Sequence, residues 1–172
     1  QFKGKSGISP YADFLMETDW CVGQIMEAVQ RNDLDKNTLI IFTTDNGTSP
    51  IANFARLRKR GAEPQNHWRG TKADAFEGGH RVPFIASWPG VIKPGTSSNQ
   101  TISLVDIMAT SAGAASINYS DDTAEDSVDL LPVMKDTSIS KPLHEAVICH
   151  SGNGMFAVRK GKWKILYCSG SG

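Results

Sequence analysis

The sequence lacks an excess of charge of either sign, since 18 Lys and Arg residues balance 18 Asp and Glu residues in a chain of 172. No bulk field therefore attracts nucleic acid or an anionic membrane surface, and we expect neither as a partner. Long hydrophobic runs are also missing, because the longest fall far short of the ~20 residues that cross a bilayer. The sequence predicts no membrane span, and any anion site must be local.

Cysteines are few. Cys21, Cys149 and Cys168 are odd in number, widely spaced and without a C-x-x-C pair. This spacing argues against a zinc site or a dithiol redox motif, and it favours buried free thiols.

The N-terminus has neither an initiator Met nor an apolar segment typical of a signal peptide. The chain reads as the middle of a longer polypeptide, and we expect both of its ends to be cuts. Its length and its 40% content of hydrophobic residues are enough for one domain with a core, which we take to span residues 1–172.

The periodicity of apolar residues predicts a helix at 10–31, begun by Ser9 as N-cap and Pro10 at the first helical position. Its apolar residues, expected to face a sheet, are Tyr11, Phe14, Leu15, Thr18, Val22, Ile25, Met26 and Val29. The β-branched run at 38–44 is typical of a strand buried in a parallel sheet.

The remaining segments continue an α/β pattern. We predict a long loop at 49–70, a second buried strand within 81–90, and a helix from Thr101 or Ser103 to about Ala114 with Leu104, Ile107, Met108 and Ser111 inward. A surface loop at 118–127, a helical turn broken by Pro132, a strand at 145–150 and a hairpin about Lys160-Gly161 follow.

Asp45 and Asn46 stand where the first predicted strand ends, in the stretch "TTDNG". Ligands of open α/β sheets gather outside the carboxyl ends of strands. A carboxylate oxygen beside a carboxamide oxygen suits Ca²⁺ or Mg²⁺, and Gly47 lets the backbone turn away. The alternative is an Asx-turn without a ligand.

The stretch "GTKADAFEGGHR" is a second candidate cluster. Lys72 lies in a Gly-flanked loop, from which its ammonium could reach a tetrahedral anion or only solvent. Glu77 and Arg81 are close enough to pair and brace the turn, while Gly78 and Gly79 permit positive backbone angles. We expect that bracing to be structural.

The sequence predicts a different place or role for each of the four histidines. His67, in the predicted loop, either lines a substrate pocket or is simply exposed. His80 is assigned no catalytic role, His144 is placed at the surface, and His150 is a weaker pocket candidate.

The blocks "YADFLMETDWCVGQIMEAV", "NTLIIFTTDNG", "GTKADAFEGGHRVPFIASWPG" and "FAVRKGKWKIL" occur in an order that resembles the second half of the catalytic domain of an arylsulfatase-type sulfatase, in the alkaline phosphatase superfamily. The resemblance implies an α/β fold: part of an alkaline-phosphatase-like sandwich, with a mostly parallel central sheet flanked by helices. It also implies a small C-terminal subdomain from about residue 145.

The same resemblance implies roles for single residues. Asp45 and Asn46 match two ligands of one calcium ion, with magnesium less favoured, and Lys72 matches the lysine that contacts a sulfate oxygen. The substrate would be a sulfate ester, and the protein would be exported to the periplasm, the outside or a lysosome. The acid and amide that end a buried strand would thus serve a metal site.

The family's nucleophile is a formylglycine made within a C-x-P-S-R type motif, which none of the three cysteines matches. We therefore expect the formylglycine in the missing N-terminal half, and we expect the isolated chain to be inactive. Two alternatives stay open: a phosphate or phosphonate ester hydrolase of the same superfamily, or a non-catalytic α/β module that binds an anion or a partner through "RLRKRG" at 56–61.

Half of such a sheet would expose strand edges and a broad apolar face. We therefore expect the isolated chain to self-associate in solution, which light scattering would measure.

Overall fold

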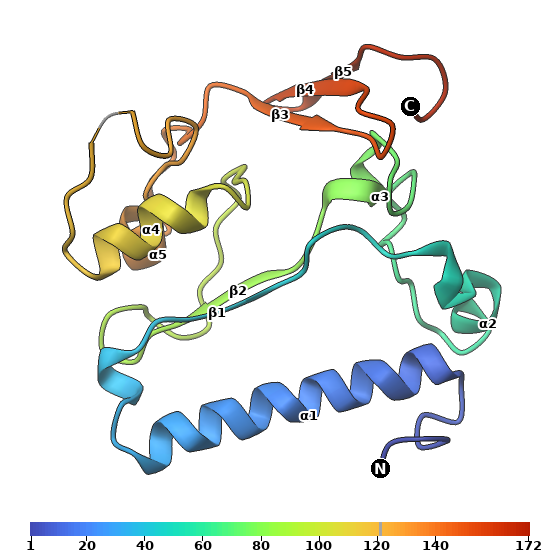
Figure 1. The fold of residues 1–172 in the computed structure, drawn as a ribbon, viewed down its shortest axis with the longest axis horizontal. Coiled ribbons are helices and arrows are strands. Elements are labelled where there is room, and N and C mark those ends of the chain that lie inside the picture. Colours follow the sequence, from blue (N-terminus) through green and yellow to red (C-terminus); the bar gives the residue numbers. More distant parts are fainter. Residues whose placement is uncertain (121) are drawn as a thin grey trace.

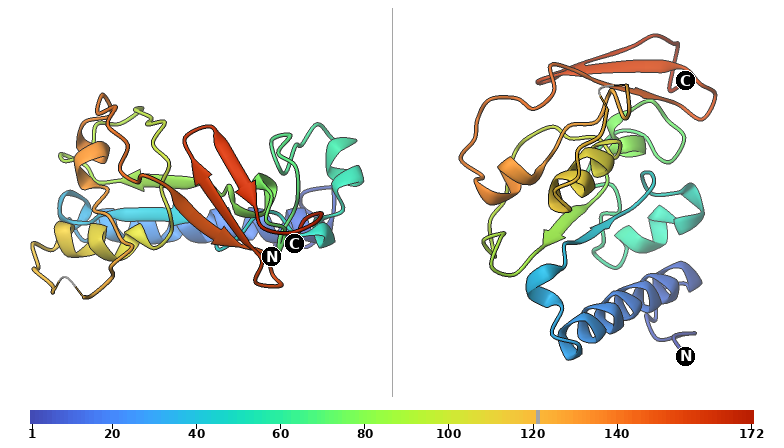
Figure 2. Two further views of the ribbon diagram at one scale, coloured as in Figure 1. Left: turned by 90° about the horizontal axis from the view of Figure 1, so that it is seen from above. Right: turned by 60° about the vertical axis from the view of Figure 1, so that its left-hand side comes forward.

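The computed structural model describes residues 1–120 and 122–172 as a mixed α/β structure. The helices are α1 (Pro10–Arg31), α2 (Phe54–Arg58), α3 (Glu77–His80), α4 (Asp106–Ala114) and α5 (Leu131–Lys135), with two 3₁₀ turns, η1 (Asp35–Asn37) and η2 (Pro50–Ala52). The strands are β1 (Ile40–Thr43), β2 (Phe84–Ser87), β3 (Val147–His150), β4 (Phe156–Lys160) and β5 (Trp163–Leu166). Figure 1 shows α1 on one side of the β1–β2 pair, with α4, α5 and the β3–β5 sheet on the other, and the right view of Figure 2 shows the same order.

Helix α1 begins and ends as its sequence predicts. The Ser9 hydroxyl accepts a hydrogen bond from the Ala12 amide at 3.2 Å, and Pro10 occupies the first turn. The predicted apolar face is only partly covered: Tyr11, Thr18, Val22 and Val29 are half-buried, whereas Phe14, Leu15, Ile25 and Met26 are exposed. The described part of the chain therefore leaves half of this face without a packing partner.

Strands β1 and β2 form a two-stranded sheet in which Ile40 pairs with Ser87 and Thr43 with Phe84. The pairing is antiparallel, and so is every other strand pair among the described residues. The parallel pairing expected for the first strand is not found among residues 1–120 and 122–172. Residues 44–83 fold back at the end where β1 finishes, so the chain enters β2 from that same end (Figure 1).

The loop predicted at 49–70 contains helical turns that the sequence pattern did not reveal, η2 and α2. The Asn53 side chain accepts from the Arg56 amide and so caps α2. Farther along, the Thr48 hydroxyl donates to the Pro64 carbonyl at 2.7 Å, and the Gln65 carboxamide donates to the Gly70 carbonyl. These two bonds lie within residues 48–70 and close the segment on itself.

Helix α4 starts at Asp106, later than predicted, and its buried residues are Asp106, Ala109 and Thr110. The predicted inward set is wrong for Met108 and Ser111, which are exposed. The reason is that α4 packs against residues 127–130: Ser127 and Thr110 hydroxyls accept from the Ala109 and Leu130 amides.

Asp106 is fully buried and organises this region. Its carboxylate accepts from the Ser103 amide at 2.7 Å and from the Val128 amide at 3.0 Å. The His144 Nε2 atom lies 2.9 Å from both carboxylate oxygens, and its side chain is only 11% exposed. The surface position expected for His144 is therefore wrong, because this histidine satisfies a buried acid.

The β3–β4–β5 sheet lies apart from the β1–β2 pair. The hairpin predicted about Lys160-Gly161 is confirmed, with Lys160 opposite Trp163 and Gly161 at a positive φ of 56°. Pro132 occupies the first turn of α5 and does not break it. The loop at 118–127 is largely exposed, while Asp121 lies outside the described residues.

Two findings concern the cysteines and the membrane. Cys21 is exposed and Cys149 and Cys168 are partly buried, so burial of all three free thiols was a wrong expectation. Among the described residues, no helix has both the length and the hydrophobicity that crossing a bilayer requires.

Replacing Asp106 by Ala tests this buried network. Removing the carboxylate leaves three donors without an acceptor, so we expect the free energy of unfolding to fall by about 3–5 kcal/mol. Urea unfolding followed by tryptophan fluorescence measures it. The control is Asp136→Ala, which removes an exposed carboxylate bound only to Ser138 and should barely change the midpoint. Equal effects of the two variants would contradict the assignment.

Candidate functional site

The turn that follows β1 is held against two other segments by its backbone. The Gly47 amide donates to the Gly79 carbonyl at 2.9 Å, and the Lys72 amide donates to the Thr48 carbonyl at 3.0 Å. Gly47 is buried, and a Cβ atom added to it would overlap the carbonyl oxygen of Gly78. Asp45 and Asn46 are thereby brought beside the loop that carries Lys72.

Helix α3 contains two glycines, Gly78 and Gly79, at positions that other backbone segments approach closely. A Cβ atom on Gly78 would overlap the Gly70 carbonyl oxygen, and one on Gly79 would overlap that of Asp74. The Gly78 amide also donates to the Arg69 carbonyl at 2.7 Å. Close approach, and not positive φ as predicted, explains both residues, since neither has a positive φ.

Asp45 is exposed and Asn46 half-buried. Among the described residues, neither side chain takes part in a hydrogen bond or an ion pair; only the Asn46 backbone carbonyl accepts a bond, from the Thr44 hydroxyl at 3.3 Å. Two unengaged oxygen donors at a strand end fit a hard cation such as Ca²⁺, which takes 6–8 oxygen ligands. The described part of the chain holds no cluster of three or more His, Cys, Asp or Glu side chains suited to a metal. Asp45 and Asn46 alone would supply only a minority of the oxygen ligands that Ca²⁺ takes.

The loop around Lys72 contains a local hydrogen bond and an unusual backbone conformation. The Asp74 carboxylate accepts from the Thr71 amide at 2.7 Å, and Ala73 has a φ of 77°, which non-glycine residues rarely adopt. The Lys72 side chain remains exposed. A fixed backbone with a free ammonium is the arrangement that an anion-binding lysine requires.

Glu77 has more partners than its sequence neighbours suggest. Arg81 Nη1 lies 3.8 Å from Glu77 Oε2, so the predicted pair is present. Closer contacts come from the C-terminal sheet: Lys164 Nζ lies 3.0 Å from Oε1, and Arg159 Nη1 bonds to Oε2. Arg81 also stacks on the Trp68 ring, with Cζ 4.2 Å from the centroid. The sequence analysis missed Arg159 and Lys164.

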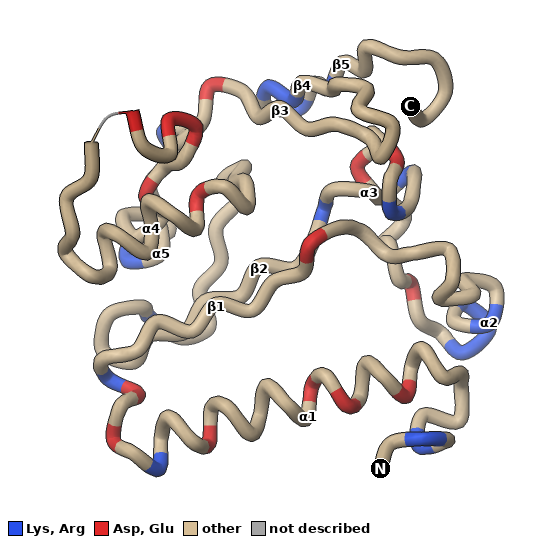
Figure 3. Tube along the Cα trace, in the orientation of Figure 1, with Lys and Arg blue, Asp and Glu red and all other residues tan. Residues whose placement is uncertain are grey.

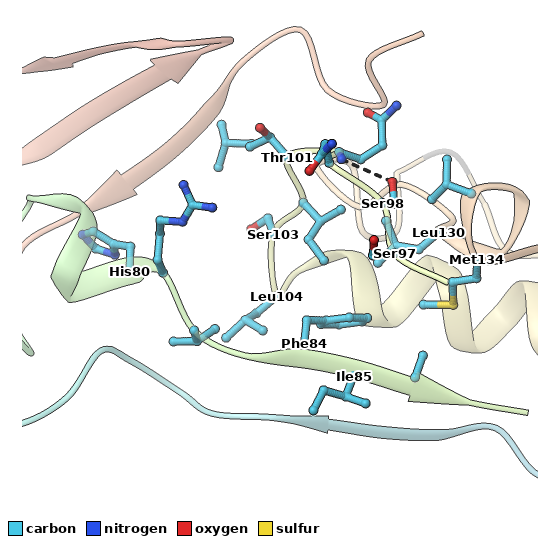
Figure 4. A pocket seen from close by; sticks show the side chains of 18 of the residues that line it. His80, Phe84, Ile85, Ser97, Ser98, Thr101, Ser103, Leu104, Leu130 and Met134 are labelled. Carbon is cyan, nitrogen blue, oxygen red and sulfur yellow. Dashed lines mark hydrogen bonds between the residues drawn. The ribbon is translucent and has the colours of Figure 1, made fainter. Parts of the chain in front are cut away.

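A cavity of about 700 Å³ extends from this cluster along β2. Asp45, Glu77, His80 and Arg81 line one part of it, and Figure 4 shows His80 at the α3 end, away from the apolar side chains of Phe84, Leu104, Leu130 and Met134. Lys72 and His67 do not line it. The cavity thus extends from the strand end that carries Asp45 to apolar side chains along β2.

His80 is the perturbed group in this cavity. Burial lowers its pKa below the ordinary 6.5, and the positive charge of Lys164 adds to the lowering, against smaller opposing effects of Glu77 and the Asp74 backbone. Its Nε2 atom is buried and has no hydrogen-bond partner among the described residues. The folded protein therefore favours the neutral imidazole.

The other sequence candidates lie outside the cluster. The His67 side chain is 78% exposed, and its Nδ1 atom lies 4.0 Å from Glu63. His150 is exposed and bonds to the Ser151 carbonyl. Neither is drawn into the site by a contact with Asp45, Asn46 or Lys72 in the described structure.

Basic residues gather at α2 (Figure 3), as the "RLRKRG" run requires. Part of that positive charge interacts with neighbouring side chains of the same segment. Arg58 pairs with Glu63 at 3.1 Å, bonds to Gln65 and lies over the Phe54 ring. This segment therefore offers less free positive charge than the sequence implies.

A lysine loop that is joined by its backbone to a strand end with two hard oxygen donors is an arrangement expected of an α/β protein that handles an oxyanion. The comparisons with known proteins specify this class. The sulfatase family model matches residues 1–117, and the chain belongs to the sulfatase family. The prediction of that family from the sequence blocks is confirmed.

Individual relatives and solved structures support the same family. The chain is similar to the N-acetylgalactosamine-6-O-sulfatase of Bacteroides thetaiotaomicron (33% identity, 96% of this chain, 32% of the relative) and to arylsulfatase A of Bos taurus (38%, 96% and 32%). A sulfatase structure from work on glycosaminoglycan metabolism by Bacteroides thetaiotaomicron superposes with a TM-score of 0.83 at 33% identity, covering 96% of this chain and 34% of that one. A Pseudoalteromonas sp. sulfatase gives 0.79 at 27%, with 96% and 32% covered. The predicted alkaline-phosphatase-like α/β fold is thus confirmed, and the chain spans about a third of the length of these relatives.

Acidification tests the burial of His80. Because its folded pKa lies below 6.5, the unfolded chain binds more protons just below that pH, so stability is full above 6.5 and falls as the pH drops toward the folded pKa. We expect the melting temperature to decline between about pH 7 and pH 5, and His80→Asn to flatten this decline. His67→Asn, at an exposed position, should keep it. A decline unchanged in His80→Asn would show that other groups cause it.

Proposed function

We propose that this chain is part of a sulfatase that hydrolyses a sulfate ester, and that it supplies the anion-binding lysine and two calcium ligands. The observation that carries the proposal is the pair of backbone bonds, Gly47 to Gly79 and Lys72 to Thr48, that hold the Asp45–Asn46 turn beside the Lys72 loop. Membership of the sulfatase family supports it.

The chemistry follows from the charges. Cleavage of an S–O ester bond builds negative charge on the sulfate oxygens, and fixed positive groups stabilise it. Lys72 would donate to a sulfate oxygen, while Asp45 and Asn46 would hold Ca²⁺, which supplies Lewis-acid stabilisation when bound. Glu77 and Arg81 would brace the turn beside them.

We further propose that the substrate is a carbohydrate or aryl sulfate, by similarity to relatives named as N-acetylgalactosamine-6-sulfatases and arylsulfatases. The cavity beside Asp45 offers space for the alcohol part of such an ester. Residues 49–70, which contain the exposed His67, do not line this cavity, and we propose that they contact a part of the alcohol that extends beyond it. Export of the protein, expected from the resemblance, is likewise a proposal.

The formylglycine would belong to another part of a longer polypeptide. Other residues of that polypeptide would cover the exposed apolar residues of α1. Without that cover, the same residues would promote self-association of the isolated chain. The phosphate or phosphonate alternative is less favoured, since the family model and the relatives described above are sulfatases. The binding-module alternative is weakened by the internal pairing of Arg58.

Activity is tested first with this chain and then with the complete product of its gene. We expect the chain alone to hydrolyse no aryl sulfate. In the complete product, Lys72→Ala should lower kcat/KM roughly 10²–10³-fold, as loss of one oxyanion donor does. The control Lys59→Ala removes an exposed lysine of "RLRKRG" and should have little effect. Faster hydrolysis of phosphate than of sulfate esters by the complete product would overturn the proposal.

Calcium binding is tested on this chain by titration calorimetry. Two protein ligands are few, so we expect a weak site with Kd on the order of 10⁻³ M. Asp45→Asn should weaken it further, because it removes the only carboxylate of the pair. Asp33→Asn, which removes a carboxylate from an exposed turn at a positive φ, is the control. Equal calcium affinity in both variants would exclude Asp45 as a ligand.

A further inference from the structure

Two positive side chains face each other in the C-terminal hairpin. Arg159 of β4 and Lys164 of β5 are directly opposite in the strand register. Opposite residues of an antiparallel pair project from the same face of the sheet, and like charges placed there are destabilising. This pair therefore needs an anion between its two charges.

Glu77 provides that anion from α3. Its Oε1 atom lies 3.0 Å from Lys164 Nζ, and its Oε2 atom bonds to Arg159 Nη1. The side chains are 13% exposed for Lys164, 21% for Glu77 and 27% for Arg159, so solvent screens their interaction only partly. One carboxylate thus joins two strands to the turn that packs against Gly47.

Two backbone bonds reinforce the same junction. The Gly152 amide donates to the Ala73 carbonyl at 2.7 Å, and the Ala75 amide donates to the Ser171 carbonyl at 2.8 Å. Ala73 directly follows Lys72 and has a φ of 77°, a conformation that surrounding contacts must maintain in a residue other than glycine. Residues 152–171 therefore contact the loop at residues 73, 75 and 77.

We propose that Glu77 is a positioning residue for Lys72: by clamping Arg159 and Lys164, it docks the C-terminal hairpin on the 71–77 loop and so fixes the direction of the lysine. The catalytic meaning of this proposal rests on the proposed role of Lys72 in sulfate binding. A charged group displaced by about 1 Å can lose on the order of 10²-fold in rate, so such a clamp matters even without touching substrate.

Hydrogen exchange on this chain tests the clamp without any assay of activity. Glu77→Gln keeps the shape and removes the charge. We expect the amides of Ala75 and Gly152, which report docking, and of Lys72, which reports the loop, to exchange at least roughly tenfold faster. Unchanged exchange at the Lys72 amide would overturn the proposal.

The chain offers a matched control. Glu145, just before β3, and Lys160, at the end of β4, form an exposed ion pair of 2.6 Å on the same sheet as Arg159 and Lys164. Glu145→Gln should leave all three amides unchanged. If Glu77→Gln does not fold, the variants Lys164→Met and Lys164→Arg test the clamp instead. We expect faster exchange of the Lys72 amide in Lys164→Met and normal protection in Lys164→Arg. Equal exchange of this amide in the two variants would overturn the clamp.

Kinetics of the complete gene product separate positioning from simple structural support. Glu77→Gln should lower kcat roughly tenfold with KM little changed, because the misplaced lysine fails mainly in the transition state. Lys164→Arg should retain kcat, and a kcat unaffected by Glu77→Gln would overturn the proposal. Absence of any sulfatase activity in the unmodified product would instead refute the proposed function, while the exchange results would still decide the clamp.

Discussion

The site depends on backbone packing between two turns that have no side chains at the point of contact. Gly47, after β1, meets Gly78 and Gly79 of α3, and these meet the carbonyls of Gly70 and Asp74. Every methyl group added at these three positions would overlap a backbone oxygen, which cannot move aside as a side-chain tip can. The positions of Asp45, Asn46 and Lys72 all follow from this contact.

Electrostatic interactions then act on an already defined backbone. Glu77 stands at the start of α3, where its carboxylate reaches Arg81 on its own segment and Arg159 and Lys164 on the hairpin. Farther away, Asp106 plays a comparable part in joining α4 to residues 128 and 144. Glu77 and Asp106 are each a partly or fully buried acid that accepts hydrogen bonds from separate segments, and these bonds hold the segments in one arrangement.

Local signals predicted the local features. Spacing and the Ser9-Pro10 pair defined α1, a turn at Lys160-Gly161 defined the hairpin, and a strand ending in "DNG" identified Asp45 and Asn46 as candidate ligands. Features that need a distant partner were not found. The antiparallel direction of β2 depends on how residues 44–83 return, and the burial of His144 depends on Asp106, 38 residues away.

The partners of Glu77 illustrate the same limit, with one signal that sequence reasoning missed. Arg159 and Lys164 are 82 and 87 residues from Glu77, too far for any periodicity to link them. The observed register of the hairpin places two cations opposite each other, which indicates that an acid from elsewhere must approach that face. The glycines of "EGGH" carried a further signal, since close approach of backbone segments explains them better than flexibility does.

This long separation has a consequence for synthesis. A chain that leaves the ribosome from its N-terminus presents Glu77 and the Lys72 loop first, and the two cations of the clamp follow only 82 and 87 residues after Glu77. At the usual ~5–20 residues per second, the loop waits several seconds for the hairpin that holds it. A message truncated shortly before Arg159 would thus encode Asp45, Asn46 and Lys72 and the glycine contact between their turns, but neither cation that pairs with Glu77.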